Sequence, residues 1–470
     1  MPPEASKVDA LVVGAGIAGI TAARCLQERG CRTAVVEAEA IPGGRVRTET
    51  WEGCRVELGA VYMTRRYEEL VRTLDALEVR GELVPLRNAF RTGVRRGERW
   101  SYVDYGQTAN LLARTRDFAR FSLLPWRDRA SLAKLMPPMA RVVARRMRFF
   151  DVASAASIDA GRLVDVVSPD AARYFVSPLI EVFFGYELEQ IAMPVVALAA
   201  DAPGRALTLR AGMGTLARTL AGGLDVRYAQ RVTRLEIEGP AGPVSITASG
   251  GSGEVVYRAQ GAVIATASDA ARELWPGAPD GTRRFLESTA YSDSYLVFLR
   301  TKERFQKVDR SGKELYMEVV PGGAALQAIL FLNSVAPDGG LVAATATPAA
   351  RRSLDDEALA ARLESEAVEL HPQLRDQVVA RRAVRTPRVV PLFPAGRARE
   401  LQAFRSRLAA GPVQLAGDYL YGPCMESAAQ AGRAAAERLH AHIRPNGTAP
   451  APRGLLGGRR RARQAPPSRP

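Results

Sequence analysis

The feature that most constrains the fold is a glycine pattern near the amino terminus, Gly14-Ala-Gly16-Ile-Ala-Gly19. The apolar run 10–13 before it predicts a buried strand, and residues 20–26 after it carry apolar side chains at helical spacing. A second apolar, β-branched run, 33–36, ends at Glu37. Strand, glycine turn, helix, strand and terminal acid together predict a βαβ unit that binds a dinucleotide.

Each glycine of this pattern has a physical role. Gly14 permits the tight turn, Gly16 lets backbone amides approach a pyrophosphate, and Gly19 allows the helix to pack closely on the strand. Ala18 belongs to the first turn of that helix, whose free amides and dipole attract phosphate. The Glu37 carboxylate is suited to accept hydrogen bonds from ribose hydroxyls and disfavours a 2′-phosphate. This unit alone leaves NAD and FAD as alternatives.

Two turns that follow the second strand decide between these cofactors. They are Pro42-Gly43-Gly44-Arg45 and Glu57-Leu58-Gly59-Ala60. With them the sequence resembles the flavin-dependent amine oxidase superfamily, which includes monoamine oxidases, protoporphyrinogen oxidases and carotenoid-type desaturases. The resemblance implies FAD, with Gly43, Gly44 and Arg45 around the pyrophosphate and with Gly59 and Ala60 near the isoalloxazine. An arginine there offers a planar, charged fork to phosphate oxygens.

The resemblance extends along almost the whole chain. The position of Val232 matches a residue whose backbone meets the adenine, and Ala265 lies in a strand that returns to the cofactor domain. Near the carboxyl end, Gly417 and Asp418 match the ribityl–phosphate region, and a helix that begins at Met425 is aimed at the flavin. No cysteine lies between residues 391 and 411, where the family's covalent flavin attachment falls, so we expect non-covalent FAD.

These interleaved motifs predict an α/β fold of two discontinuous domains. An FAD-binding, Rossmann-like βαβ domain of the glutathione-reductase type is interleaved with a substrate domain of mixed sheet and helices. The predicted segments are 1–85, 205–285 and 405–444 for the cofactor domain, 86–204 and 286–404 for the substrate domain, and 445–470 for a disordered tail rich in Arg and Pro.

Composition excludes several other classes of protein. A chain of 470 residues with 47% hydrophobic residues has the make-up of a packed globular enzyme. Its 3 histidines and 4 cysteines show no ligand spacing, so we predict no metal site. The net charge is +15, yet no zinc finger, helix-turn-helix or RNP-like motif accompanies it, so nucleic acid is not the expected partner. Without a signal peptide or an apolar span, we expect a cytoplasmic protein.

Much of the positive charge lies in the segment 110–150, which holds ten basic residues and two acidic ones. Arg and Lys with Leu, Met, Phe and Trp on helices are typical of an interfacial helix on anionic lipid. This segment resembles the helical insertion of protoporphyrinogen oxidases and desaturases. Two alternative interpretations of the basic segment remain. It forms an arginine-rich face that is simply solvated, or its charge steers a partner or substrate toward the protein.

Two departures from the monoamine oxidase pattern indicate to which branch of the superfamily this sequence is similar. Monoamine oxidases have a lysine at the position that falls near Leu296, and a tyrosine where this chain has Cys424. The carboxyl-terminal motif is closer to protoporphyrinogen oxidases and desaturases. Besides Leu296 and Cys424, the candidate pocket residues are Tyr295, Tyr419 and Tyr421, although a single tyrosine is more often half-buried packing, and a buried cysteine is often inert.

The sequence therefore predicts an FAD-dependent oxidoreductase that dehydrogenates a largely apolar or macrocyclic small-molecule substrate. Such hydride loss needs no histidine or lysine at the flavin, and arginines are available for substrate carboxylates. Two other hypotheses stay open. One is an amine or amino-acid oxidase that makes an imine and hydrogen peroxide. The other is a flavin-binding scaffold without catalysis.

Overall fold

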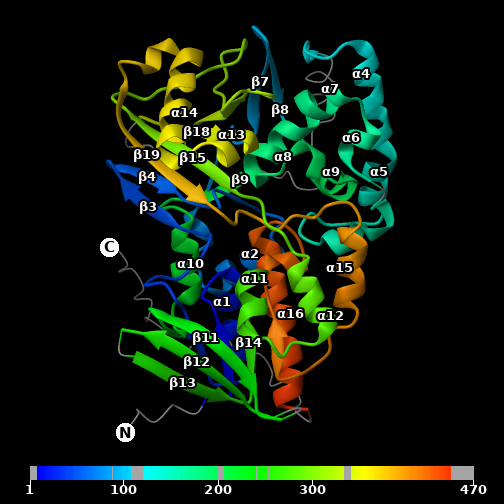
Figure 1. Ribbon diagram of the computed structural model, residues 1–470, viewed down its shortest axis with the longest axis vertical. Coiled ribbons are helices and arrows are strands. Elements are labelled where there is room, and N and C mark those ends of the chain that lie inside the picture. The colour runs from blue at the N-terminus through cyan, green and yellow to red at the C-terminus, as the bar shows by residue number, and fades with distance from the viewer. Residues whose placement is uncertain are drawn as a thin grey trace, which may run out of the picture.

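A five-stranded parallel sheet forms the core of the lower half of the molecule (Figure 1). Its strand order is β10-β2-β1-β14-β20, and every neighbouring pair is parallel. The central strands are buried on both faces, which explains their continuous apolar sequences. The bounds are β1 (Ala10–Val13), β2 (Thr33–Val36), β10 (Asp225–Arg227), β14 (Gly261–Ile264) and β20 (Val413–Leu415).

The computed structural model describes residues 8–86, 88–106, 120–159, 161–199, 206–239, 242–251, 253–332 and 340–445. The predicted tail, apart from its first residue, and residues 110–119 of the basic segment lie outside the described residues.

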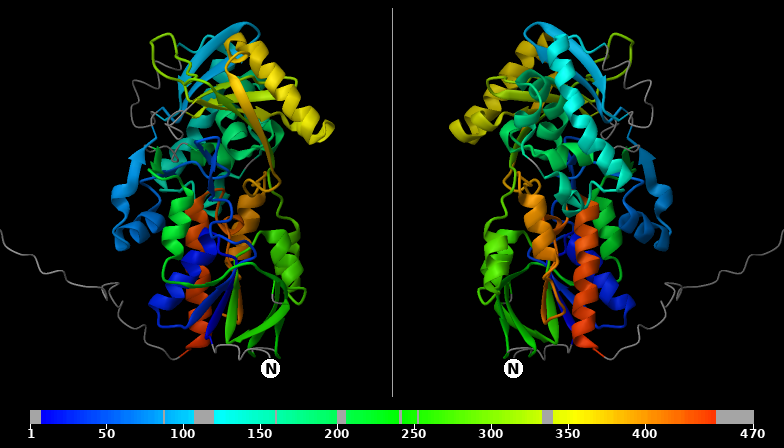
Figure 2. Two further views of the ribbon diagram at one scale, coloured as in Figure 1. Left: turned by 90° about the vertical axis from the view of Figure 1, so that its left-hand side faces the viewer. Right: turned by 90° about the vertical axis from the view of Figure 1, so that its right-hand side faces the viewer.

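Two helices pack against each other beside this sheet. Helix α1 (Ile17–Glu28) follows the glycine turn, and α16 (Met425–Ile443) is the long helix near the carboxyl end. They approach closely at Gly432, where a Cβ would lie only 2.1 Å from the carbonyl oxygen of Ala18. The two ends of the sequence therefore share one packed layer, drawn blue and orange-red in Figure 2.

Smaller elements complete the lower half and the waist of the molecule. A three-stranded antiparallel sheet, a hairpin, and a second three-stranded sheet of order β5-β9-β6 lie around the parallel sheet with several helices. The strands are β11 (Gln230–Ile237), β12 (Val244–Gly250), β13 (Gly253–Ala259), β3 (Thr48–Trp51), β4 (Cys54–Glu57), β5 (Met63–Thr64), β6 (Leu83–Pro85) and β9 (Ala206–Leu209); the helices are α2 (Glu68–Ala76), α10 (Gly214–Ala221), α11 (Ser268–Leu274), α12 (Asp280–Glu287) and α15 (Arg397–Arg405).

A seven-stranded mixed sheet forms the upper half. Its order is β19-β15-β18-β17-β16-β7-β8, antiparallel throughout except for the parallel pair β16 and β7. The bounds are β7 (Arg91–Arg96), β8 (Arg99–Asp104), β15 (Ser294–Thr301), β16 (Met317–Val319), β17 (Leu326–Phe331), β18 (Gly340–Ala346) and β19 (Val378–Thr386). Helix α14 (Asp356–Leu370) covers one face through Leu359 and Leu363, and α13 (Pro348–Ser353) precedes it.

Helices cluster at the side of this sheet, at the upper right in Figure 1. They are α4 (Trp126–Ser131), α5 (Met136–Ala144), α6 (Leu163–Val166), α7 (Pro169–Ala171), α8 (Ser177–Phe184) and α9 (Met193–Ala199). Parallel sheet, mixed sheet and helices together confirm the predicted α/β fold class. Among the described residues, no helix combines the length and the apolar character needed to cross a bilayer.

Candidate cofactor and substrate site

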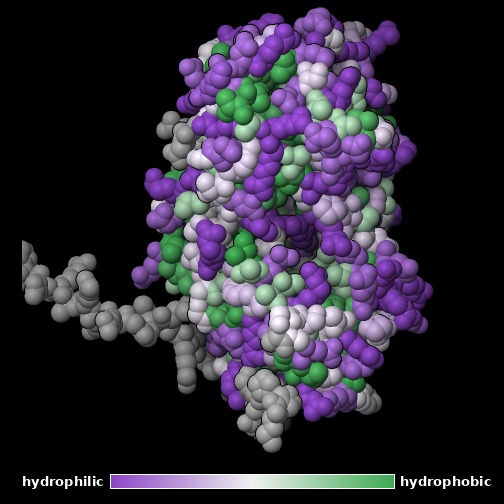
Figure 3. Space-filling model, turned by 60° about the vertical axis from the view of Figure 1, so that its left-hand side comes forward, coloured by the Kyte–Doolittle hydropathy of each residue, from purple (hydrophilic) through white to green (hydrophobic). Residues whose placement is uncertain are grey.

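A cavity of about 830 Å³ lies between the parallel sheet and the mixed sheet. On the face shown in Figure 3, the surface is hollowed at mid-height and polar side chains border the hollow. The cavity is lined by every residue predicted to contact the cofactor except Gly19. A Cβ on Gly19 would lie 1.9 Å from the carbonyl oxygen of Gly14, so this glycine serves helix packing.

The glycine turn leaves the amino end of α1 open to the cavity. Gly14 has φ +99°, and a Cβ there would lie 3.0 Å from the carbonyl oxygen of Ala265, which follows the end of β14. A Cβ on Gly16, by contrast, would meet no atom within 4 Å. Free backbone amides at the end of a twelve-residue helix, with open space in front of them, suit a pyrophosphate.

Glu37 stands at the carboxyl end of β2 and lines the same cavity. Its Oε2 accepts a hydrogen bond from the amide of Ala15 at 2.5 Å, and its Oε1 accepts one from the amide of Glu39 at 2.8 Å. These two bonds fix the carboxylate beside the glycine turn. Val232 lines the cavity from β11. The carboxylate is thus placed for the ribose hydroxyls of a dinucleotide.

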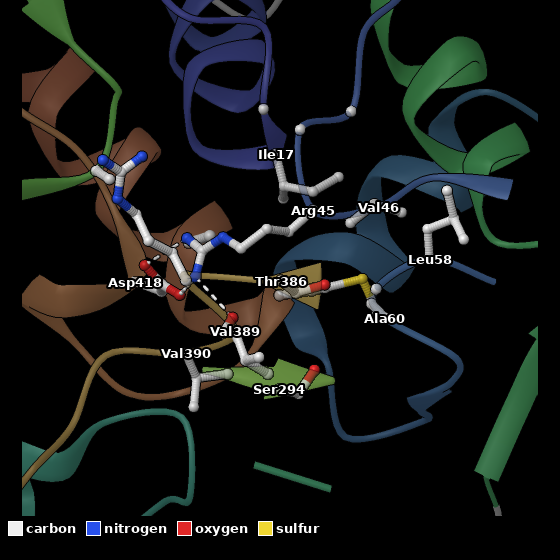
Figure 4. Close-up of a pocket in the computed structure, with 18 of the residues that line it drawn as sticks. Ile17, Arg45, Val46, Leu58, Ala60, Ser294, Thr386, Val389, Val390 and Asp418 are labelled. Atoms are coloured by element: carbon white, nitrogen blue, oxygen red, sulfur yellow. Dashed lines mark hydrogen bonds and ion pairs between the residues drawn. The ribbon is translucent and has the colours of Figure 1, made fainter. Parts of the chain in front are cut away.

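Arg45 joins the amino-terminal turns to the carboxyl-terminal motif. Its guanidinium forms two bonds to the Asp418 carboxylate, 2.9 Å from Nη2 to Oδ1 and 2.8 Å from Nη1 to Oδ2. Nη1 also donates to the carbonyl oxygen of Val389 at 3.0 Å (Figure 4). The sequence assigned this fork to phosphate oxygens, and that stays a prediction: Arg45 lines the cavity while Asp418 and Val389 hold its guanidinium in place.

The second predicted turn packs directly on the first. A Cβ on Gly59 would lie 1.9 Å from the carbonyl oxygen of Arg45, and the amide of Ala60 donates to that oxygen at 3.0 Å. Gly43 has φ +124° and donates to the carbonyl of Ala15 at 2.8 Å. Close backbone contacts, which leave no room for side chains, therefore hold three turns together around the cavity. These turns are residues 14–16, 43–45 and 59–60.

Cys424 and Met425 bring the start of α16 to the cavity. The Sγ of Cys424 lies 3.2 Å from the hydroxyl of Ser427. Burial raises the pKa of the Cys424 thiol to about 11, with Ser427 and Tyr67 opposing this rise and Glu426 adding to it. At neutral pH this side chain is a neutral thiol, which does not favour a nucleophilic role.

Of the three tyrosines predicted as pocket residues, the structure places one, Tyr295, in the cavity lining. Its ring packs among the residues under α14, and its hydroxyl donates to the carbonyl of Asp356 at 2.5 Å. Tyr419 is fully buried outside the cavity lining. Tyr421 borders a separate polar cavity of about 440 Å³, under the guanidinium of Arg405.

Leu296 also lines the cavity, on the face of β15 to which alternate side chains point. Ser294, Leu296 and Phe298 line it with Val182 and Phe183 of α8. The described residues that line the cavity include no lysine and no histidine.

Several lining residues were not predicted from the sequence. They include three tyrosines and two further polar side chains, Tyr62, Tyr67, Tyr316, Glu181 and Gln327. For Glu181 a signal existed, since it is the sole acid in the apolar run 176–186. The other four have no local pattern that separates them from core residues.

This arrangement fits a flavin dinucleotide. The glycine turns and the helix amino terminus would donate backbone amides to the pyrophosphate, the fixed Glu37 carboxylate would accept from the ribose hydroxyls, and the rest of the cavity has apolar walls. Among the described residues, no group of three or more His, Cys, Asp and Glu side chains is placed to hold a metal ion.

Fold and site together define a flavin-dependent oxidoreductase with FAD as its cofactor. The chain belongs to the flavin-containing amine oxidoreductase family, whose sequence profile matches residues 17–440.

Curated relatives fall in more than one branch of this family. The coproporphyrinogen III oxidase of Propionibacterium freudenreichii subsp. freudenreichii is 26% identical over 229 residues, which cover 49% of this chain and 41% of that protein. The phytoene dehydrogenase of Streptomyces griseus is 31% identical over 264 residues, covering 49% of each chain. The chain thus matches less than half the length of either relative.

The fold is shared with solved structures. One is the cyclohexylamine oxidase from Brevibacterium oxydans IH-35A, with a TM-score of 0.70 and 18% identity. That alignment covers 93% of this chain and 99% of the other. At this identity the likeness concerns the fold alone.

Proposed function

We propose that this protein dehydrogenates a largely apolar substrate, with loss of a hydride and a proton from neighbouring atoms to form a C=C or C=N bond. The observation that carries the proposal is that one continuous cavity includes both the dinucleotide cradle and apolar walls. These walls are formed by Val182, Phe183, Leu296 and Phe298. Bound FAD supplies the two-electron acceptor for such a reaction. The apolar side chains bind the substrate and exclude water.

The composition of the lining supports hydride loss from an activated carbon. The position that falls near the lysine of monoamine oxidases is Leu296, and Cys424 carries a neutral thiol. With neither a lysine nor an ionised thiol there, the chain's own contribution is to position the substrate C–H bond. Relatives named for porphyrinogen and phytoene substrates agree with this kind of reaction.

The test is an absorbance scan of the purified holoprotein, with and without oxygen, against a porphyrinogen, an apolar polyene and a set of primary and secondary amines. We expect the visible flavin band to bleach with the porphyrinogen or the polyene. Bleaching by amines alone would refute this reaction and favour the second candidate, amine oxidation, which the half-buried carboxyl of Glu181 in the cavity lining supports. A purified chain without a flavin band would favour a scaffold.

We also propose that the protein works in the cytoplasm and touches an anionic membrane through α4 and α5, at the right-hand edge in Figure 1. Trp126, Met136 and Val143 support this, because their exposed fractions are 73%, 62% and 75%. Exposed basic side chains flank them: Arg127, Lys134, Arg141, Arg145 and Arg146. Large apolar side chains with Arg and Lys suit lipid headgroups.

Co-sedimentation with liposomes at low salt tests the membrane proposal. We expect retention by vesicles that contain anionic lipid, and its loss in the triple variant W126S/M136S/V143S. A control variant, V256S/V308S/V379S, removes exposed valines elsewhere on the surface and should leave retention unchanged. Equal recovery in the supernatant with and without anionic lipid would overturn the proposal.

A further inference from the structure

A second, small cavity of about 440 Å³ lies apart from the cofactor and substrate site. Its walls come from residues 151–154, from α15 and the turn after it, and from α16, the helices drawn orange and orange-red in Figure 1. Among the described residues, none lines both cavities. The short 3-10 helix Asp418–Leu420 separates them, since Asp418 lines the large cavity and Leu420 the small one. A ligand of the small cavity would therefore bind apart from the flavin and from the substrate.

Arg438, on α16, brings to the small cavity a positive charge that no ion pair matches. Its Nε donates to the Oε1 of Gln414 at 2.7 Å, and within the described part of the chain its guanidinium forms no ion pair. The adjacent acid, Glu437, is engaged by Arg29 at 2.9 Å and by Arg433 at 3.8 Å. The two terminal nitrogens of Arg438 are thus available to a ligand.

Gln414 fixes the orientation of this guanidinium. It is only 4% exposed, and its Nε2 donates to the carbonyl oxygens of Ala409 at 3.0 Å and Gly411 at 3.2 Å. Its amide oxygen is therefore held toward Arg438, which bonds to it through Nε alone. A charged group that is oriented before its ligand arrives loses less conformational entropy on binding.

Arg405, on α15, is a second fixed guanidinium in the same lining. Its Nη1 lies 2.5 Å from the Oδ1 of Asp151, and its guanidinium carbon lies 3.8 Å from the centre of the Tyr421 ring. Burial lowers the pKa of Arg438; Tyr421 opposes this shift, and the charge of Arg405 adds to it. The lining therefore combines two arginines that repel each other with one acid, and a bound anion would relieve the repulsion.

We propose that the small cavity binds a phosphate group between the guanidiniums of Arg438 and Arg405. A guanidinium matches phosphate oxygens in charge and geometry, and a phosphate has enough oxygens to accept from both arginines at once. Tyr421 and Gln402 line the cavity too, and their side chains form no hydrogen bond within the described residues, so they add neutral donors. A cavity of about 440 Å³ also holds a small organic group attached to the phosphate. This site goes beyond the proposed function, because it involves neither the flavin nor the dehydrogenated substrate.

Calorimetric titration of the FAD-loaded protein with inorganic phosphate, at an ionic strength kept constant with chloride, tests the site. Bound FAD keeps phosphate out of the glycine turns. We expect Arg438→Gln to weaken phosphate binding by roughly 10- to 100-fold, as for a hydrogen-bonded charge, and Arg438→Lys, which keeps the charge without the fork, to bind with intermediate affinity. Arg407→Gln is the matched control: Arg407 is exposed two residues beyond Arg405 and does not line the cavity, so this variant should bind as the wild type does.

Thermal unfolding provides a second measurement. Phosphate should raise the unfolding temperature of the wild type above its value in chloride of equal ionic strength, and should raise that of Arg438→Gln much less. Equal phosphate affinity in the wild type and Arg438→Gln would overturn the site. Tighter binding of malonate than of phosphate by the wild type would overturn the assignment to phosphate.

Two further probes distinguish a free phosphate from a lipid headgroup. Methyl phosphate represents a soluble monoester, and vesicles of phosphatidic acid represent the headgroup. Methyl phosphate binding that falls in Arg438→Gln, with unchanged retention by the vesicles, would support a soluble ligand. Retention that falls in Arg438→Gln and stays at the wild-type level in Arg407→Gln would support the headgroup.

Discussion

Replacing Gly432 by alanine should separate the two helices that carry the cofactor cradle. The new Cβ would lie 2.1 Å from the carbonyl oxygen of Ala18 and 3.1 Å from the amide nitrogen of Ala22. A normal carbon–oxygen contact is more than about 3 Å, so α16 and α1 must move apart by about 1 Å. Overpacking of this kind costs about 1–3 kcal/mol, against a gain of about 1 kcal/mol from the better helix former.

The displacement should also weaken cofactor binding, because Ala18 lies in the first turn of α1, next to Gly16. Thermal unfolding of the apoprotein measures the first effect, and FAD titration measures the second. Gly281→Ala is the matched control: it lies in α12, where a Cβ would meet nothing within 4 Å, so this variant should be neutral or slightly stabilised. A Gly432→Ala protein as stable as this control, with wild-type FAD affinity, would refute the reasoning.

Four further predictions concern single side chains. Arg91→Met should cost about 3–5 kcal/mol in chemical denaturation, because it strips the buried Asp309 of its 2.6 Å ion pair. Burial raises the pKa of Asp309, but hydrogen bonds from Ser311, Lys313 and Arg91 hold it below its ordinary value, so wild-type stability should fall as an acid titration descends through about pH 4. Because burial raises the pKa of Cys424 to about 11, its neutral thiol should resist iodoacetamide in the native protein at neutral pH and react after unfolding. Peptide mass spectrometry measures both. Glu37→Gln should weaken FAD binding by roughly tenfold in titration, since the amide of Ala15 loses a charged acceptor.

The cofactor half of the site was predictable because the residues of each motif lie close together in the sequence. Glycine spacing, an apolar strand and a terminal acid lie within one βαβ unit, and each is required by backbone geometry rather than by distant partners. Arg45 shows the limit of this reasoning. Its partner Asp418 is 373 positions away, and pairing at such a distance leaves no trace in the local pattern.

The substrate half was less predictable, because alternation along a strand does not say which face meets the cavity. Tyr295 and Leu296 are neighbours on β15 and both line the pocket, yet the Tyr295 ring packs among the residues under α14. Glu181 had a visible signal as a lone acid in an apolar helix. Gln327 lines the same cavity from another part of the chain, which the sequence did not bring near it.

The Arg45–Asp418 bridge also bears on how the protein is made. The cradle begins with residues 14–19, but β20 and Asp418 are translated much later. Chains grow at about 5–20 residues per second, so the early βαβ unit must wait about 20 seconds or more for its last strand. We expect nascent chains that end before β20 to capture no cofactor, which makes FAD loading a report on synthesis through Asp418.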